Sequence, residues 1–404
     1  MNARSVVIVG AGQASAVATR TLRRRGFEGR ITIVGDEPER PYQRPPLSKE
    51  YLTTSDASGL YLLPHDWTEG QDVEVRTGVR AVEVSSTDGA VRLEDGSTIA
   101  ADRVLLATGG SARRLPDTAG DRILSLRTKA DADALRAHLR PGQRVIVVGA
   151  GFIGAEVAST ARALGAEVVI LEACAVPLAR VLGDQLGGIC ARMHGEGGVD
   201  LRVDVQVQSV EQHGEEVVVS TSAGRFVADV VVVGIGITPN DAIARASGIA
   251  VDNGIVVDEF CRTSMENVYA AGDVANHFHP LFDVTLRVEH FDNASKQAAA
   301  AANNMLGRAT VFDDPHWFWS DQYGANLQYV GHADGADELV IRGSEDEPAW
   351  SAFFIRDDTV RAAFAVDSAE DIMAARELIS ARATITAEVL ADSSTDLMEL
   401  LENM

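Results

Sequence analysis

Cysteine, basic residues and long apolar runs are scarce in this 404-residue chain, and each shortage excludes something. The three cysteines, Cys174, Cys190 and Cys261, form no CxxC or CxxxxC pair, which argues against a disulfide framework and a zinc ribbon. We expect them to be small buried hydrophobic residues. No apolar run approaches the roughly 20 residues of a membrane span. We therefore expect no membrane as partner. The net charge of −23 would repel phosphate, so we expect no nucleic acid as partner either.

The start of the chain and its length set two further expectations. A predicted strand begins within a few residues of Met1, which leaves no room for a signal peptide, so we expect a cytoplasmic protein. A chain of 404 residues is too long for one hydrophobic core and indicates two or three domains.

Two glycine-rich turns of the same design are the most informative feature that is present. They lie within Val6–Ser15 and Val145–Gly154, and each joins four β-branched residues to GxGxx(G/S) and an alanine-rich helical pattern. A dinucleotide pyrophosphate needs such a turn, because glycine lets the backbone approach and a helix N-terminus offers free N–H groups. Two copies in one chain predict two dinucleotides, a flavin held permanently and a nicotinamide that visits.

The order of the remaining elements predicts the fold class. The run Val104–Ala107 is a buried strand that ends in small residues, Gly234–Asn240 punctuates the chain again, and from Trp317 the pattern alternates as in antiparallel strands. We therefore predict an α/β protein with two Rossmann-like dinucleotide-binding domains, the second inserted in the first, plus a C-terminal α+β domain. The predicted boundaries are 1–110 and 236–316 for the FAD-binding domain, 111–235 for the NAD-binding domain and 317–404 for the C-terminal domain.

An acid after the second strand of each Rossmann unit should bind a ribose. In the second unit this acid is Glu172, 23 residues after Gly149, and Ala173 follows it with no arginine beside it. A carboxylate there binds the 2′-hydroxyl of NADH and repels the 2′-phosphate of NADPH, so we predict NADH. In the first unit the acid comes one residue late, within Gly35–Glu37, and either Asp36 or Glu37 can serve.

Four motifs carry a resemblance that covers essentially the whole chain. They are RPYQRPPLSK at 40–49, NGIVV at 253–257, AAGD at 270–273 and WFWSDQY at 317–323. With these motifs the chain resembles the FAD-dependent ferredoxin reductases of bacterial oxygenase systems, the putidaredoxin reductase and biphenyl dioxygenase reductase group. The resemblance implies electron transfer from NADH through FAD to a two-iron two-sulfur ferredoxin that feeds a cytochrome P450 or Rieske oxygenase.

The resemblance also assigns residues to the flavin. It favours Asp36 for the adenosine ribose and implies that Lys49 lies near the flavin ring, where its charge stabilises the reduced ring. An exposed lysine is the alternative for Lys49, and plain surface or core roles are the alternatives for Arg127 and Phe291. The flavin residues, by position along the chain, are Gly10, Gly12, Ala14 and Ser15 at the pyrophosphate, Asp36 at the ribose, Ala81 near the adenine, Arg127 near the pyrophosphate, Asp273 at the ribityl hydroxyls and Phe291 at the pyrimidine edge.

On the nicotinamide side the resemblance gives Glu156 a place facing the nicotinamide, where it can pair with Lys49. A charge on the helix surface is the alternative reading of Glu156. Gly236 is expected to let the nicotinamide ribose or amide approach closely. The turn residues expected to bind NADH, together with Glu172, are Gly149, Gly151, Ile153 and Gly154.

Residues 40–49 contain no sulfur, although flavin enzymes that reduce disulfides or peroxides commonly carry a reactive cysteine there. An NADH oxidase or a rubredoxin reductase remains an alternative, as does a redox-responsive binding protein like apoptosis-inducing factor, for which basic surfaces or localisation signals are expected. His277, His279 and His290 lack HxxxH spacing, so we expect no metal. Trp317 or Trp319 is our candidate for the ferredoxin contact, with core packing as the alternative. We expect the protein to be a monomer or a homodimer.

Overall fold

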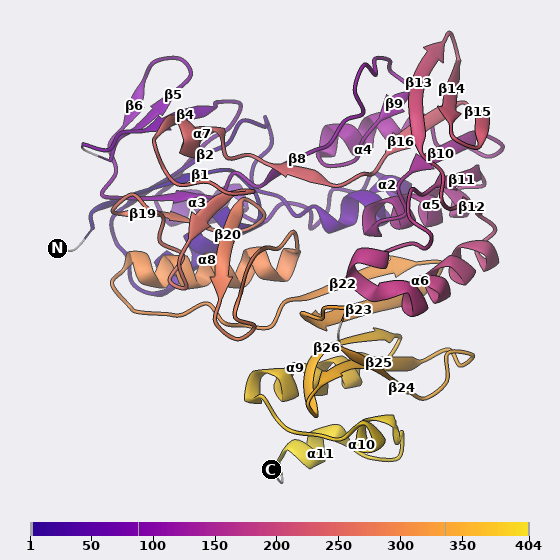
Figure 1. Ribbon diagram of the computed structural model, residues 1–404. Helices are drawn as coiled ribbons and strands as arrows, with labels where there is room; N and C mark the ends of the chain where they lie inside the picture. Colours follow the sequence, from indigo (N-terminus) through magenta and orange to yellow (C-terminus); the bar gives the residue numbers. More distant parts are fainter. Residues whose placement is uncertain (1–2, 88, 336, 403–404) are drawn as a thin grey trace. The chain divides into compact units, whose positions relative to one another are not determined.

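The computed structural model describes residues 3–87, 89–335 and 337–402 (Figure 1). The chain divides into two compact units. The first contains residues 1–43, 57–111 and 238–316, and the second contains 44–56, 112–237 and 317–404. Strands β8 (Gly110–Ala112) and β17 (Ile237–Pro239) lie where the chain passes from one unit to the other. The three-domain boundaries expected from the sequence remain a prediction.

A five-stranded parallel sheet in the order β19-β7-β1-β2-β3 is the centre of the first unit. Helices α1 (Gln13–Arg24) and α8 (Phe291–Met305) pack together, and their buried alanines join Ile8, Ile31 and Leu105 in one core. Small alanine side chains let helices and sheet approach closely. The strands are β1 (Ser5–Val9), β2 (Arg30–Val34), β3 (Val73–Arg76), β7 (Arg103–Leu106) and β19 (Val268–Ala270).

Two small sheets and short helices complete the first unit. Strands β4 (Ala81–Val84), β5 (Val91–Leu93) and β6 (Thr98–Ile99) are antiparallel. Strand β20 (Ala275–His279) pairs in parallel with β18 (Ile255–Val257) and antiparallel with β21 (Val284–Arg287). The short helices are α3 (His65–Gly70) and α7 (Ala242–Ala246).

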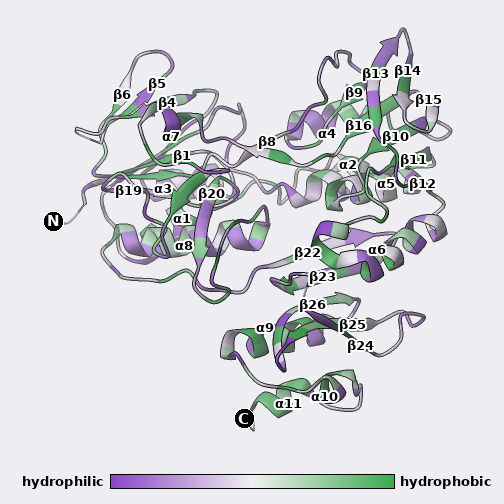
Figure 2. Ribbon diagram, viewed as in Figure 1, coloured by the Kyte–Doolittle hydropathy of each residue, from purple (hydrophilic) through white to green (hydrophobic). Residues whose placement is uncertain are grey.

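The second unit repeats the parallel design in the order β12-β11-β10-β16-β9. All four valines of β16 (Val230–Val233) are buried, as expected for a central strand covered on both faces. The hairpin strand β13 (Val207–His213) is largely hydrophilic in Figure 2, in agreement with its exposed side chains. The other strands are β9 (Ile123–Leu124), β10 (Arg144–Val148), β11 (Glu167–Leu171), β12 (Asp200–Arg202), β14 (Glu216–Thr221) and β15 (Gly224–Ala228).

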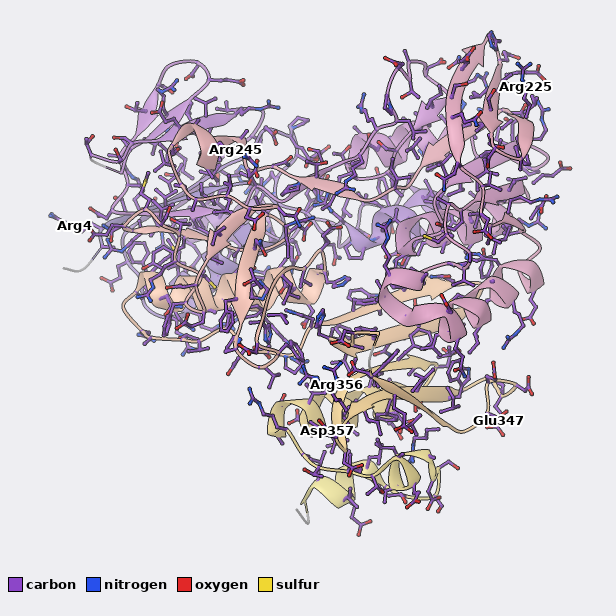
Figure 3. The ribbon with its side chains drawn as sticks, in the orientation of Figure 1. Arg4, Arg225, Arg245, Glu347, Arg356 and Asp357 are labelled. Carbon is purple, nitrogen blue, oxygen red and sulfur yellow. The ribbon has the colours of Figure 1, made fainter. Side chains whose placement is uncertain are left out.

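The C-terminal part of the second unit is an antiparallel sheet in the order β22-β23-β26-β25-β24. Apolar residues of α6 (Ala179–Glu196) and of this sheet share one core, and Phe152 of the helix α5 (Phe152–Ala163) meets Phe318 edge to face at 4.4 Å. Charged side chains such as Arg225 and Glu347 extend outward from the ribbons (Figure 3). The strands are β22 (Trp317–Gln322), β23 (Ala325–Gly331), β24 (Glu338–Arg342), β25 (Trp350–Arg356) and β26 (Thr359–Val366).

The remaining helices of the second unit are η1 (Pro45–Ser48), α2 (Glu50–Thr54), α4 (Lys129–Arg136), α9 (Ala369–Ala381), α10 (Ala387–Ala391) and α11 (Leu397–Glu402). None of the helices in the described ranges is long and apolar enough to span a membrane. The predicted fold class, two Rossmann-like dinucleotide-binding domains plus a C-terminal α+β domain, is confirmed.

Candidate functional site

The first glycine-rich turn leads from β1 into α1, and its first glycine is fixed by the fold. Gly10 has φ +113, and a Cβ there would lie 2.1 Å from the carbonyl oxygen of Ala107 at the end of β7. The Gly10 N–H also donates to the Val34 carbonyl at 2.7 Å. The sheet therefore crowds this position from both neighbouring strands, and any side chain there would displace one of them.

The N-terminus of α1 is open to a ligand. Gly12 is the N-cap, no side chain caps the helix, and a Cβ on Gly12 would meet nothing within 4 Å. Within the described residues, the buried Ser15 Oγ and Gln13 Oε1 have no hydrogen-bond partner. Uncapped N–H groups, free space and partnerless polar atoms together fit an anionic pyrophosphate. Ala14 is buried in the same first turn of the helix.

The two candidate acids after β2 have different surroundings. Asp36 is exposed, and its carboxylate lies 3.4 Å from the Arg80 guanidinium. Glu37 accepts a 2.6 Å hydrogen bond from the hydroxyl of the buried Tyr42. An exposed carboxylate is accessible to a ribose, so this difference favours Asp36. Ala81, expected near the adenine, is a buried residue at the start of β4.

The residues expected near the flavin ring and ribityl chain include two in the first unit. Asp273 is half-buried and follows Gly272, whose N–H donates to Gln297 Oε1 at 2.8 Å. Arg287 Nη1 donates to the Asp273 carbonyl oxygen at 3.0 Å, which holds the turn. Phe291 begins α8 and is half-buried. The ribityl role of Asp273 and the pyrimidine role of Phe291 remain predictions.

The second glycine-rich turn leads from β10 into α5 and repeats this geometry. Gly149 has φ +98, and a Cβ there would lie 2.6 Å from the Gly234 carbonyl oxygen. A Cβ on Gly154 would lie 2.2 Å from the Gly149 carbonyl oxygen, whereas one on Gly151 would meet nothing within 4 Å. Gly151 is the N-cap, no side chain caps α5, and Ile153 is 46% exposed. This turn also fits a pyrophosphate.

The acid of the second unit is anchored to the backbone. Glu172 Oε2 accepts from the Ala150 N–H at 2.7 Å, and Oε1 accepts from the Cys174 N–H at 2.8 Å. These bonds hold a negative charge beside the glycine-rich turn, as the predicted preference for NADH over NADPH requires. Gly236, expected near the nicotinamide ribose or amide, is exposed with φ +91 and open space where a Cβ would lie.

A buried ion pair joins the end of the RPYQRPPLSK motif to α5. Lys49 Nζ lies 2.7 Å from Glu156 Oε2, and the side chains are 15% and 3% exposed. The Ser320 hydroxyl donates to Glu156 Oε1 at 2.7 Å, and the Ser48 hydroxyl donates to Oε2. Neither Lys49 nor Glu156 is therefore a plain surface charge. The structure brings the two residues together as expected, and their roles toward the cofactors remain predictions.

The serines of this cluster were not among the predicted site residues. Ser320 belongs to the WFWSDQY motif, and its position between the buried Phe318 and Gln322 marks it as inward-facing. Ser48 is held in turn, because the Thr160 hydroxyl donates to its carbonyl oxygen at 2.7 Å. The signal in the sequence was the small Ser320 at a position that alternates with Trp319 and Asp321, on the same face of the strand as Phe318.

Arg127 lies in the second unit, before α4. Its N–H donates to Asp131 Oδ2 at 3.1 Å, and its carbonyl accepts from Arg44 Nη1 at 2.5 Å. These bonds fix its backbone and leave its role toward the pyrophosphate a prediction.

The cysteines show no sign of thiol chemistry. Cys190 and Cys261 are buried, and Cys174 is half-buried. Burial raises the pKa of Cys190 to about 12 and also raises the pKa of Cys261, so both thiols stay protonated at neutral pH. The expectation of buried cysteines holds for these two and is wrong for Cys174.

Comparison with known proteins extends over the whole architecture. Residues 4–298 match the family "Pyridine nucleotide-disulphide oxidoreductase", and residues 317–401 match "Reductase C-terminal". The chain is 39% identical over 398 residues to rhodocoxin reductase of Rhodococcus erythropolis, covering 97% of this chain and 93% of that protein. It is 38% identical over 404 residues to the ferredoxin–NAD(+) reductase component of the biphenyl dioxygenase system of Paraburkholderia xenovorans, covering 98% of each.

Among solved structures, the chain is similar to the reductase in the covalent putidaredoxin reductase–putidaredoxin complex. The TM-score is 0.95 at 36% identity, covering 99% of this chain and 98% of that one. The resemblance inferred from the four motifs is confirmed.

Proposed function

We propose that this chain, which belongs to the pyridine nucleotide-disulphide oxidoreductase family, passes electrons from NADH through FAD to a two-iron two-sulfur ferredoxin that feeds an oxygenase. As a member of this family it is an oxidoreductase with FAD and NADH as cofactors. The observation that carries the ferredoxin partner is the near full-length similarity to reductases named for ferredoxins or for ferredoxin-dependent oxygenase systems.

Each turn has a defined task in this function. The open N-terminus of α1 binds the FAD pyrophosphate, and the open N-terminus of α5 binds the pyrophosphate of NADH. Glu172 selects NADH, because its carboxylate, held beside the glycine-rich turn by two backbone N–H groups, would repel a 2′-phosphate. FAD, when bound, supplies the conversion between the two-electron chemistry of NADH and one-electron transfer to a ferredoxin.

The ion pair positions a charge for this chemistry. Glu156 is held by the hydroxyls of Ser48 and Ser320, and it holds the Lys49 ammonium in turn. The ammonium therefore has one fixed position and does not reorganise as negative charge develops nearby. Lys49 acts by stabilising that charge, and Glu156 acts through Lys49 as a positioning residue.

The tryptophans of β22 form the contact for the ferredoxin in this proposal. Trp317 and Trp319 are half-buried, their rings stack at 5.2 Å, and the Trp317 indole N–H donates to Gln328 Oε1 at 3.0 Å. They alternate with the buried Phe318 and Ser320, so both lie on the face of β22 opposite those side chains. A net charge of −23 disfavours long-range steering of an acidic ferredoxin, so a local apolar contact is required.

The test is reduction of cytochrome c by NADH, with and without a two-iron two-sulfur ferredoxin. We expect reduction to depend on the ferredoxin and to support product formation by a coupled oxygenase. Rapid NADH oxidation by oxygen without ferredoxin would instead indicate an NADH oxidase, and preference for rubredoxin would indicate a rubredoxin reductase. Failure to reduce any small electron carrier would favour a binding role like that of apoptosis-inducing factor.

A tryptophan variant separates docking from flavin chemistry. Trp319→Ala should slow ferredoxin-dependent cytochrome reduction while ferricyanide reduction by NADH stays nearly normal. Equal loss in both assays would mean that the residue supports the fold or the flavin site and has no special part in docking.

A cytoplasmic location and a monomeric or homodimeric state complete the proposal. Cell fractionation tests the location, and light scattering tests the oligomeric state.

A further inference from the structure

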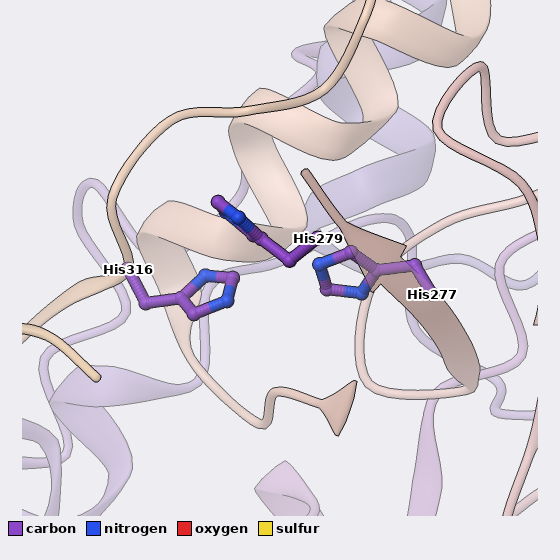
Figure 4. Close-up of side chains that lie close together, drawn as sticks. All are labelled: His277, His279 and His316. Carbon is purple, nitrogen blue, oxygen red and sulfur yellow. The ribbon is translucent and has the colours of Figure 1, made fainter. Parts of the chain in front are cut away.

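Three buried histidines of the first unit come together at one point, although the chain separates the third from the other two. His277 and His279 lie on the same face of β20, because strand side chains alternate, and Phe278 between them is 39% exposed. His316 comes from the segment that follows α8. One ring nitrogen of each lies within 4.8 Å of the others (Figure 4).

The ring nitrogens of His277 lie where they make no hydrogen bond to a described residue. Both of its ring nitrogens are buried and have no hydrogen-bond partner within the described residues. Buried polar atoms normally have hydrogen-bond partners, so two ring nitrogens without one among the described residues need an explanation.

His279 is oriented as a metal ligand would be. Its Nε2 lies 3.0 Å from the carbonyl oxygen of Asp314. A carbonyl only accepts hydrogen bonds, so Nε2 carries the hydrogen and Nδ1 keeps the lone pair. Metal-bound histidines commonly donate their second nitrogen to a carbonyl in this way, which fixes both tautomer and ring orientation.

Aromatic side chains pack against the cluster. The Phe282 ring centroid is 4.6 Å from that of His279, and the Phe312 centroid is 5.1 Å from that of His277. Asp314, whose carbonyl oxygen contacts His279, has its carboxylate 3.4 Å from the Lys296 ammonium, which also pairs with Asp292 at 2.8 Å. Among the described residues, the cluster consists of histidines alone.

We infer that His277, His279 and His316 form a binding site for a divalent transition metal, zinc in the first place. Three neutral imidazoles suit zinc, and a fourth position is left for water. Zinc–nitrogen bonds of about 2.0–2.1 Å set tetrahedral ligand nitrogens about 3.4 Å apart, so the rings close by roughly 1 Å on binding. The site joins β20 to the segment after α8, and none of its three residues belongs to a glycine-rich turn.

The experiment uses full-length, FAD-loaded protein without a histidine tag, freed of metal by a chelator and then titrated with zinc chloride. Elemental analysis and calorimetry should give one zinc per wild-type chain. His277→Gln and His316→Gln should each weaken zinc binding at least tenfold. His213→Gln is the matched control, because His213 is 63% exposed in the second unit and its loss should leave binding unchanged.

A second pair of variants keeps the test decisive if a glutamine disturbs the core. His277→Phe and His316→Phe conserve most of the ring volume, and the flavin absorbance reports whether they fold. Zinc should raise the melting temperature of the wild type by a few degrees and leave that of the phenylalanine variants unchanged. Wild-type protein that binds no zinc, or binds it as the phenylalanine variants do, would overturn the inference.

Discussion

The two glycine-rich turns share one backbone design and differ in the charges around it. In both, the first glycine lies against a carbonyl of a neighbouring strand end and the second leaves open space. Seven residues after the first glycine, α1 carries the apolar Val17. At the corresponding position, α5 carries the buried Glu156. Asp36, the acid after β2, is exposed. Its counterpart Glu172, after β11, accepts hydrogen bonds from two backbone N–H groups. The turn specifies a dinucleotide, and the positions after it specify the chemistry.

Replacing the first glycine should be the most damaging change in either turn. Gly10→Ala and Gly149→Ala force a side chain into positive φ and into a carbonyl 2.1 or 2.6 Å away. We expect each to cost on the order of 4–5 kcal/mol, enough to prevent soluble folding. Circular dichroism and yield of soluble protein measure this. Normal folding of either variant would show that the two turns are not equivalent in the way described.

Breaking the ion pair of α5 should come next. Lys49→Met leaves the Glu156 carboxylate, which is 3% exposed, without its cation, at a cost of about 3–5 kcal/mol. The double variant Lys49→Met/Glu156→Gln removes the stranded charge and should recover most of that loss. Urea unfolding of both variants gives the two free energies. If the double variant is no more stable than the single one, the charge is not what the lysine compensates.

Acid should destabilise the second unit through His194 of α6. Burial lowers the pKa of this histidine to about 4, from a usual value near 6.5, and its Nδ1 lies 2.7 Å from the Tyr323 hydroxyl. The unfolded chain takes up a proton below pH 6.5 that the folded chain refuses down to about pH 4. The contribution of His194 to the free energy of unfolding is therefore fully present above pH 6.5. It falls by about 3 kcal/mol as the pH is lowered from 6.5 to 4.

Comparison with His194→Gln checks this pH dependence. The variant should be less stable at pH 7, and its unfolding free energy should fall less steeply between pH 6.5 and 4. Parallel curves for the two proteins would assign the acid sensitivity to other groups.

The second glycine of each turn should separate the two cofactors. Gly12→Ala and Gly151→Ala place a methyl group in open space, so both proteins should fold. The methyl group lies where the pyrophosphate must approach, and we expect about ten- to hundredfold weaker binding, or 1.4–2.7 kcal/mol. Flavin content should fall in Gly12→Ala and stay normal in Gly151→Ala, whose Michaelis constant for NADH should rise instead. The reverse pattern would exchange the assignments of the two turns.

The acids after the strands should have the smallest effects. Glu172→Gln should raise the Michaelis constant for NADH about tenfold and narrow the preference over NADPH, because a charged hydrogen-bond acceptor is lost. Asp36→Asn, at an exposed position, should lower flavin affinity only a few-fold. Steady-state kinetics with both nucleotides and flavin titration give these values. A wild type that uses NADPH as well as NADH would contradict the role given to Glu172.

The elements that the sequence predicted best are those set by local pattern. The β-branched runs form β1 and β10, and the glycines after them form the expected turns. Both features depend on only a few neighbouring residues, because strand propensity and the preference for glycine at positive φ are local. The Lys49–Glu156 pair came from the family resemblance. Ser48 and Ser320 were missed because they lie 108 and 164 residues from Glu156, and only the tertiary fold brings their hydroxyls to it. His316 was missed for the same reason.

The Glu156 carboxylate has a consequence for building chimeras. It binds one hydroxyl from η1 and one from β22, so three separate stretches of sequence meet at a single side chain. Exchanging residues 317–404 for those of another reductase therefore also exchanges a donor to a group within the nucleotide-binding part. A graft that keeps serine at position 320 preserves that donor. A graft with an apolar residue at position 320 leaves Glu156 Oε1 buried without that donor. The chimera would then be destabilised even though the grafted segment folds normally.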